Sequence, residues 1–120
     1  MPNRSIGGYA EDVLVASAAR TTSADSGEMV GFSDATTLRA QLDVTAASGT
    51  TPSLVVVIED TLDGTTWNVV GTFAAKTAAG REVINVTTPF ANRLRVRWTI
   101  TGTTTSFTFS VAVASQAPTV

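Results

Sequence analysis

Apolar and polar residues alternate along much of the chain, and this alternation is typical of strands that bury one face and expose the other. The clearest run is 38–45, in which four apolar residues alternate with polar ones: Leu38, Ala40, Leu42 and Val44. The same period of two recurs at 93–100 and 107–113. Residues 54–58 are apolar without a break, which predicts a central strand covered on both sides. No window shows apolar residues at helical spacing with a charged opposite face.

Glycine, proline and small polar residues separate these runs and mark turns at 47–52, 63–64, 79–80, 88–89 and 101–103. Asp-Gly and Gly-flanked pairs supply the positive φ that a tight turn needs. We predict about eight short strands, near 12–18, 28–33, 37–45, 53–60, 66–73, 82–87, 93–101 and 105–114. Such strands favour an all-β fold, a two-layer antiparallel β-sandwich with jelly-roll or Greek-key connections.

The first residues, 1–11, interrupt the alternation and are mostly small or polar. We therefore divide the chain into an N-terminal arm, 1–11, and a β-sandwich domain, 12–120. A free end of this composition is usually mobile, so we expect a neighbouring subunit to hold the arm by strand addition. The partner-contacting residues that we predict in the arm are Arg4, Ile6 and Tyr9. The start of the chain shows no apolar signal-peptide core, which favours a protein made and used inside a cell.

Composition removes several classes of function. The 120 residues include no cysteine and no histidine, which excludes disulfides, thiolate or imidazole metal sites and histidine acid–base chemistry. Only 15% of the residues are charged and the net charge is −2, so no basic field is present to hold nucleic acid. The longest aliphatic run, Leu54 to Ile58, is too short to cross a membrane.

Carboxylates are the remaining candidates for chemistry. Glu59, Asp60 and Asp63 cluster beside a glycine, and hard cations such as calcium prefer oxygen ligands, but the spacing lacks the alternation of a calcium loop. A pair of acids could also hydrolyse a glycoside, and the candidates are Glu11, Asp12, Glu28, Glu59 and Glu82. A β-sandwich of this length leaves few residues to form the walls of an active-site cleft. We therefore predict no enzyme, no catalytic residue, no cofactor and no metal site.

The segment 61–67, TLDGTTW, predicts a tight hairpin. Asp63 can accept backbone N–H groups across the turn, Gly64 suits the left-handed position, and Trp67 can cover the base of the hairpin. The alternative is a sugar-binding platform built on Trp67. Trp98 alternates with the apolar residues of its strand and is expected in the core.

Arg93, Arg95 and Arg97 occupy alternate positions of one strand and must share its outward face. Like charges in a row repel one another, so they need carboxylates across the strand or on another chain. One interpretation is a contact with a protein partner, since arginine is enriched at interfaces and the chain has seven arginines but one lysine. The other is a solvated face paired internally with acids such as Glu82.

Residues 37–115 carry a resemblance to a known group of proteins. The shared elements are an LDVT strand, the loop AASGTTPSL before a central strand, the TLDGTTW hairpin, and RLRVRWTI followed by GTTTSFTFSV. This order resembles small virion structural proteins of tailed double-stranded-DNA bacteriophages. The first 35 residues match the pattern less well.

The resemblance implies a capsid decoration (cement) protein, which binds the major capsid protein and stabilises the shell on the exterior of the virion after assembly in the host cytoplasm. Since capsid lattices present threefold and twofold points, we expect a homo-oligomer, a trimer in the first instance. Neither nucleic acid nor membrane is an expected partner. The alternatives are a head–tail or tail component and a carbohydrate-binding module displayed on the virion, with a small hydrolase the least favoured.

Overall fold

A computed structural model describes residues 3–4, 9–30 and 37–116. These residues form seven strands joined in one antiparallel sheet, and none of them is helical. The strands are β1 (Asn3–Arg4), β2 (Tyr9–Arg20), β3 (Ala24–Asp25), β4 (Thr37–Thr61), β5 (Trp67–Thr72), β6 (Gly80–Val86) and β7 (Arg93–Gln116). The prediction of an all-β antiparallel fold is confirmed. Within the same described ranges, no helix offers the length and apolar character that a bilayer span requires.

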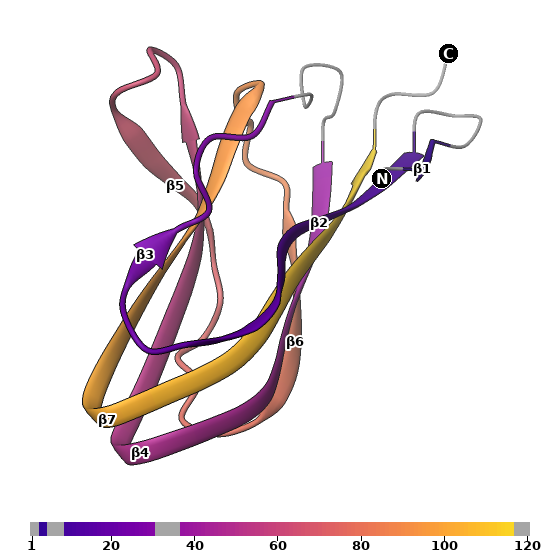
Figure 1. Ribbon diagram of the computed structural model, residues 1–120. Coiled ribbons are helices and arrows are strands. Elements are labelled where there is room, and N and C mark those ends of the chain that lie inside the picture. Colours follow the sequence, from indigo (N-terminus) through magenta and orange to yellow (C-terminus); the bar gives the residue numbers. More distant parts are fainter. Residues whose placement is uncertain (1–2, 5–8, 31–36, 117–120) are drawn as a thin grey trace.

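The long strands β4 and β7 form the centre of the fold. They pair from Thr37↔Gln116 at one end to Thr61↔Arg93 at the other, and Figure 1 shows them bending together into a V. The bend creates two half-sheets. The first half-sheet contains β2, residues 107–116 of β7, residues 37–47 of β4, and β6, with β1 beside β2. The second contains β3, residues 93–101 of β7, residues 53–61 of β4, and β5.

This arrangement corrects the predicted strand boundaries. The strands expected at 37–45 and 53–60 are the two arms of β4, and those expected at 93–101 and 105–114 are the two arms of β7. The count of eight and the division into two separate sheets are therefore not confirmed. The strand expected at 28–33 is represented by a single bridge from Met29 to Leu94, with 31–33 outside the described residues. The short β3 was not predicted.

The bend, which we call the corner, is made by closely similar local sequences in the two strands. β4 carries Ser48-Gly49-Thr50-Thr51 and β7 carries Thr101-Gly102-Thr103-Thr104. In each strand the glycine and the second threonine have positive φ: 113° and 47° in β4, 116° and 51° in β7. A Cβ on Gly49 would lie 2.8 Å from the carbonyl oxygen of Thr104, and one on Gly102 would lie 2.8 Å from that of Thr51. The turn signals predicted at 47–52 and 101–103 therefore bend a pair of strands and do not end them.

The two half-sheets enclose one hydrophobic core. Buried side chains come from both arms of both long strands, among them Leu42, Ile58, Val96 and Phe109. Trp98 of the second half-sheet meets Phe109 of the first edge to face, with ring centroids 5.5 Å apart. The expectation that Trp98 belongs to the core is confirmed, since it is buried there.

Arg20, at the end of β2, fills the seam between the half-sheets. Its guanidinium lies 5.0 Å from the centroid of Trp98 and 4.7 Å from that of Phe109. It also donates to the carbonyl oxygens of Phe109 (3.0 Å), Ala16 (2.9 Å) and Ala18 (3.1 Å). Burial lowers the pKa of Arg20 from its ordinary value. The cation therefore joins the half-sheets by contacting the Trp98 ring of the second while it donates to backbone carbonyls of the first.

We expect Arg20→Lys to lower the free energy of unfolding by about 2 kcal/mol, because an ammonium cannot donate to three carbonyls in a planar fork while stacking on two rings. Denaturant unfolding followed by tryptophan fluorescence measures this. Arg81→Lys is the matched control, since the Arg81 side chain is 64% exposed. Equal stability of the two variants would show that the seam does not depend on the guanidinium.

The opposite edges of the half-sheets also approach each other. A Cβ on Gly71 of β5 would lie 2.9 Å from a methyl carbon of Val86 in β6. In the connection between β5 and β6, Lys76 forms an ion pair with Glu82 and bridges its backbone to Leu54. Both seams of the folded sheet are thus closed by specific contacts.

Candidate partner-binding surface around the arginine row

Arg93, Arg95 and Arg97, the arginine row, lie on the outer face of the second half-sheet. They alternate along β7 with Leu94, Val96 and Trp98, all three of which are buried. Residues i and i+2 of a strand share a face, so the three guanidinium groups emerge on the same side. The sequence pattern therefore placed this row correctly. Three neighbouring positive charges need carboxylates close by.

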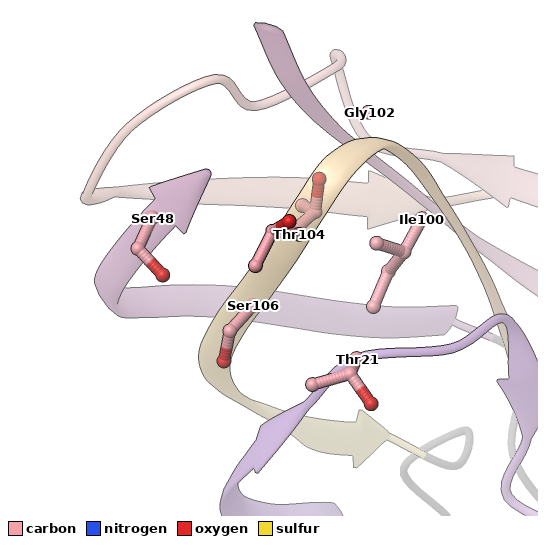
Figure 2. Close-up of a pocket in the computed structure, with 7 residues that line it drawn as sticks. Thr21, Ser48, Ile100, Gly102, Thr104 and Ser106 are labelled. Carbon is pink, nitrogen blue, oxygen red and sulfur yellow. The ribbon is translucent and has the colours of Figure 1, made fainter. Parts of the chain in front are cut away.

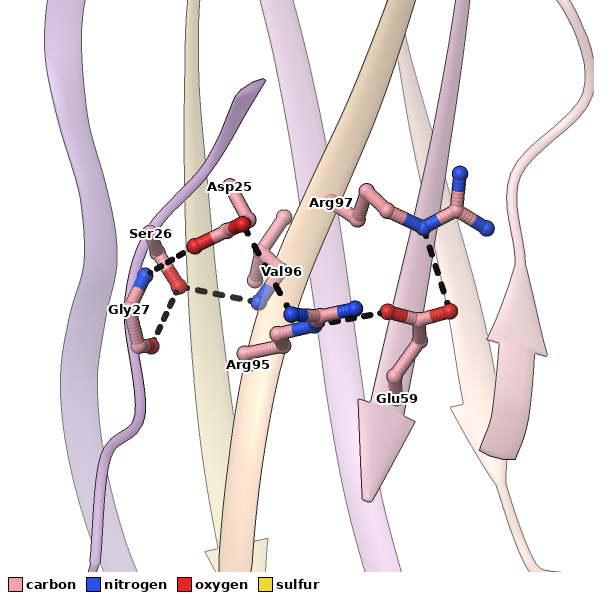
Figure 3. Close-up of polar contacts among 7 residues, drawn as sticks. All are labelled: Asp25, Ser26, Gly27, Glu59, Arg95, Val96 and Arg97. Atoms are coloured by element: carbon pink, nitrogen blue, oxygen red, sulfur yellow. Dashed lines mark hydrogen bonds and ion pairs between the residues drawn. The ribbon is translucent and has the colours of Figure 1, made fainter. Parts of the chain in front are cut away.

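Glu59 of β4 balances two of the three arginines. It stands directly opposite Arg95 in the β4–β7 register and is 4% exposed. Arg95 Nε donates to Glu59 Oε1 at 2.8 Å, and Arg97 Nε donates to Oε2 at 3.1 Å, as Figure 3 shows. Both carboxylate oxygens are thus engaged. A buried carboxylate needs this compensation, because its desolvation costs several kcal/mol when it is unpaired.

Arg95 is held from two further sides. One of its terminal nitrogens lies 3.6 Å from the carboxylate of Asp25 in β3 (Figure 3). Its guanidinium also lies 4.4 Å from the ring centroid of the half-buried Trp67. The cation covers one face of the indole and so closes that face to a stacked sugar ring. This contact favours the structural interpretation of Trp67 over a sugar platform.

The other two arginines are more open. Arg93 reaches Glu28 only at 3.9 Å, with both side chains more than one-third exposed (35% and 39%). Arg97 is 41% exposed although it bonds to Glu59. The acid suggested from the sequence, Glu82, was the wrong one, because it pairs with Lys76 across the β5–β6 connection. Asp25 and Glu28 were not identified as partners from the sequence.

The acids considered for calcium do not converge. Glu59 points to the outer face, whereas the adjacent Asp60 is buried and accepts a hydrogen bond from the backbone N–H of Ala91 at 2.9 Å. Asp63 lies in the turn that follows. In the part of the chain that the structure describes, no three acids are grouped so that they could hold a metal ion.

Asp63 organises the hairpin turn in the manner expected from the sequence. Its Oδ1 accepts hydrogen bonds from the backbone N–H groups of Thr66 at 2.7 Å and Thr65 at 2.8 Å. Gly64 has a φ of 86°, the left-handed region. The backbone hydrogen bonds from Thr66, which has the larger effect, and from Thr65 hold the pKa of Asp63 well below its ordinary value, because they favour the charged carboxylate. The turn is therefore a structural unit.

This shift has a consequence for stability in acid. Since the pKa of Asp63 is lower in the folded state, its charge stabilises the fold above the unfolded pKa of about 4, and that contribution falls as the pH drops below this value. Asp63→Asn keeps one acceptor oxygen but lacks the charge. We expect the difference in Tm between wild type and Asp63→Asn to shrink steadily from pH 6 to pH 2 in scanning calorimetry. A constant difference would contradict the assignment.

A partly open hollow of about 510 Å³ lies at the corner. Figure 2 shows its lining, which is mainly hydroxyl-bearing: Thr21, Ser48, Ile100, Gly102, Thr104, Thr105 and Ser106. The buried Thr105 Oγ1 has no hydrogen-bond partner there. None of these lining residues carries a charge or an aromatic ring, so the hollow offers no group for acid–base work or for stacking a sugar.

The arm residues stand apart from the arginine row. Arg4 lies in β1 and Tyr9 in β2, at the edge of the first half-sheet, while Ile6 lies outside the described residues. β1 pairs with β2 of its own chain (Asn3↔Glu11 and Arg4↔Ala10), and β2 begins inside the predicted arm. The five predicted contact residues that the structure describes are therefore divided between the two half-sheets, and the role of all six in binding a partner stays a prediction.

Comparison with known proteins assigns no family. A scan against protein-family models and a search of curated proteins each found no match. What this surface can bind must therefore be inferred from its contacts. It presents partly exposed guanidinium groups at Arg93 and Arg97, and nearby carboxylates balance the charge of the row.

Proposed function

We propose that the chain is a virion structural protein, a capsid decoration protein that binds the major capsid shell and stabilises it. The observation that carries this proposal is the engagement of four of its acids in structural contacts. Glu59, Asp60, Asp63 and Glu82 each accept hydrogen bonds that hold the fold together. A decoration protein needs contact area and stiffness and has no use for a free acid, base or cofactor.

The resemblance of residues 37–115 to small phage virion proteins supports the same function. The folded sheet supports it as well, since a single core closed along both seams resists deformation when neighbouring subunits move. We place the shell contact on the arginine row. The exposed guanidinium groups of Arg93 and Arg97 suit carboxylates on the capsid surface, because a planar guanidinium can bind a carboxylate through two parallel hydrogen bonds.

The test is binding of the purified protein to expanded capsid shells that lack it, measured by co-sedimentation. We expect saturation at on the order of hundreds of copies per shell, since every lattice position of one kind is filled. Saturation at about a dozen copies would favour a head–tail or tail component instead. Shells that bind none of the protein would contradict the proposal.

A variant that removes one positive charge tests the place of contact. Arg93→Gln removes a guanidinium that is 35% exposed and meets Glu28 at 3.9 Å, and it should weaken shell binding by about tenfold, because a charge-assisted contact contributes about 1.5 kcal/mol. The control is Thr77→Gln, at an exposed position between β5 and β6 that is not part of the arginine row. The Tm of each variant is measured in parallel. Equal shell binding by both variants would place the contact elsewhere.

A further inference from the structure

The outer face of the first half-sheet is a second surface that the proposed function does not use. One row of residues crosses all four of its strands, with the register Val13↔Ala112, Ala112↔Gln41 and Gln41↔Val83. Directly opposed residues in antiparallel strands share a face, so these four side chains form a continuous row. Val13 is 61% exposed and Val83 is 39% exposed. Two apolar side chains thus stand open to solvent at the two ends of the row, with Ala112 and Gln41 between them.

Charges of opposite sign flank this row. Arg39 lies two residues before Gln41 on β4, and Asp43 lies two residues after it, so both share the face. Each has a neighbour on β6: Asn85 Oδ1 accepts from Arg39 Nη1 at 3.4 Å, and Arg81 lies 3.7 Å from Asp43. Both contacts are long and exposed, which leaves the charges available to a partner.

A second copy of the chain fits this pattern in one orientation. If the twofold axis runs along the row Val13–Ala112–Gln41–Val83, each valine meets its own symmetry mate. The same operation turns the strands end for end, which places Arg39 of one copy opposite Asp43 of the other. An axis along β4 itself would instead place Arg39 opposite Arg39 and Asp43 opposite Asp43, which is repulsive.

From this pattern we propose that the chain forms a twofold-symmetric dimer, in which the outer faces of the two first half-sheets pack against each other. We call this surface the dimer face and define it by Val13, Arg39, Gln41, Asp43, Val83, Ala112 and their neighbours. The contact closes at two subunits, because each copy uses the same patch. The trimer that we expected from the sequence is the competing assembly, and the mass of the complex in solution distinguishes the two.

The size of the face fits a specific but modest dimer. Four strands spaced about 4.8 Å apart, over roughly ten residues of about 3.3 Å each, give about 600 Å² per copy, or about 1,200 Å² in total. That total lies at the lower limit for stable protein interfaces. On this face β7 carries only the short side chains of Ser110, Ala112 and Ala114. Two such sheets can therefore pack about 10 Å apart. We expect dissociation constants on the order of micromolar.

The first test is sedimentation velocity over a concentration series. Wild type should shift from monomer to dimer, and Asp43→Arg should weaken dimerisation at least tenfold, since it places two arginines opposite each other. The double variant Arg39→Asp/Asp43→Arg restores opposite charges across the axis and should dimerise like wild type. Wild type that remains monomeric at millimolar concentration, or forms a trimer, would overturn the proposal, as would a double variant no better than Asp43→Arg.

Two substitutions of exposed apolar residues test whether dimerisation depends on this face or on exposed apolar residues in general. Val83→Asp places two carboxylates against each other on the axis and should abolish the dimer. Leu62→Asp is the matched control, because Leu62 is 79% exposed in the hairpin turn away from this face, and it should leave dimerisation unchanged. Similar dimerisation of both variants would contradict the assignment of the face.

A crosslinking variant keeps the proposal testable even where a charge variant folds poorly. The chain contains no cysteine, so Ala112→Cys introduces a single thiol on the proposed axis. A short bis-maleimide should link two copies of this variant efficiently at concentrations where wild type dimerises. Thr77→Cys, at an exposed position between β5 and β6, is the control and should not crosslink. Equal crosslinking of the two variants would exclude the proposed packing.

Discussion

Gly102→Ala is expected to lower the free energy of unfolding by roughly 3–5 kcal/mol. Gly102 has a φ of 116°, where a side chain costs about 1–3 kcal/mol in backbone strain. The added Cβ would also lie 2.5 Å from Thr105 Oγ1 and 2.8 Å from the carbonyl oxygen of Thr51, and overpacking of this kind costs about 1–3 kcal/mol more. The carbonyl belongs to the paired strand, so relief would require both long strands to shift.

Gly80→Ala is the control for this prediction, because a Cβ there meets no atom within 4 Å. Chemical denaturation of both variants gives the two free energies of unfolding, and the Gly80 variant should stay within about 1 kcal/mol of wild type. If the two alanine variants were equally stable, the corner would not be the constraint that holds the half-sheets together.

Glu59→Gln should have the second largest effect, a loss of about 3 kcal/mol. The amide keeps the shape of the side chain but has only one acceptor oxygen, so either Arg95 or Arg97 loses its partner at a site that is 4% exposed. Removing one member of a buried charge pair costs about 3–5 kcal/mol, and the partial exposure of the arginines places the effect at the lower end. Thermal and denaturant unfolding both measure it.

Glu28→Gln provides the comparison, because Glu28 meets Arg93 at 3.9 Å with both side chains well exposed. Such surface pairs contribute about 0–1 kcal/mol, so this variant should be close to wild type. A double variant Glu59→Gln/Arg95→Gln should be less destabilised than the sum of its single variants, since the two residues share one interaction. Similar losses at Glu59 and Glu28 would show that the arginine row is not anchored by its buried acid.

The alternation of side chains predicted most of the local structure. It gave the strands, their buried faces and the outward position of the arginine row, because the period of two is a local property of the backbone. The TLDGTTW hairpin was also predicted in detail, since Asp63, Gly64 and the two threonines act within a few residues of one another.

The global path of the chain was not predictable in the same way. Gly49 and Gly102 look like ordinary turn signals, and only their pairing with each other's strand converts two turns into one corner. The pairing of charged residues was not predictable either, because it also depends on the path of the chain. Glu59 and Arg95 are 36 positions apart, and it is the register of β4 against β7 that sets them face to face. Arg20 gave no sequence signal, since the rings that it joins lie far along the chain.

The two outer faces of the fold suit two different tasks. The second half-sheet presents exposed guanidinium groups over a charge-balanced base, which suits a partner that brings carboxylates. The first half-sheet presents a low, self-complementary face, which suits a second copy of the chain. If both proposals hold, a dimer displays two arginine rows at once and can bridge neighbouring capsid subunits, with avidity that a monomer lacks.

Electron cryomicroscopy of the mature virus particle tests the central claim most directly. We expect V-shaped density of this folded sheet on the outer surface of the shell, repeated at every lattice position of one kind and touching at least two capsid subunits. Particles that carry this chain only along the tail axis, or not at all, would contradict a role in holding the shell together.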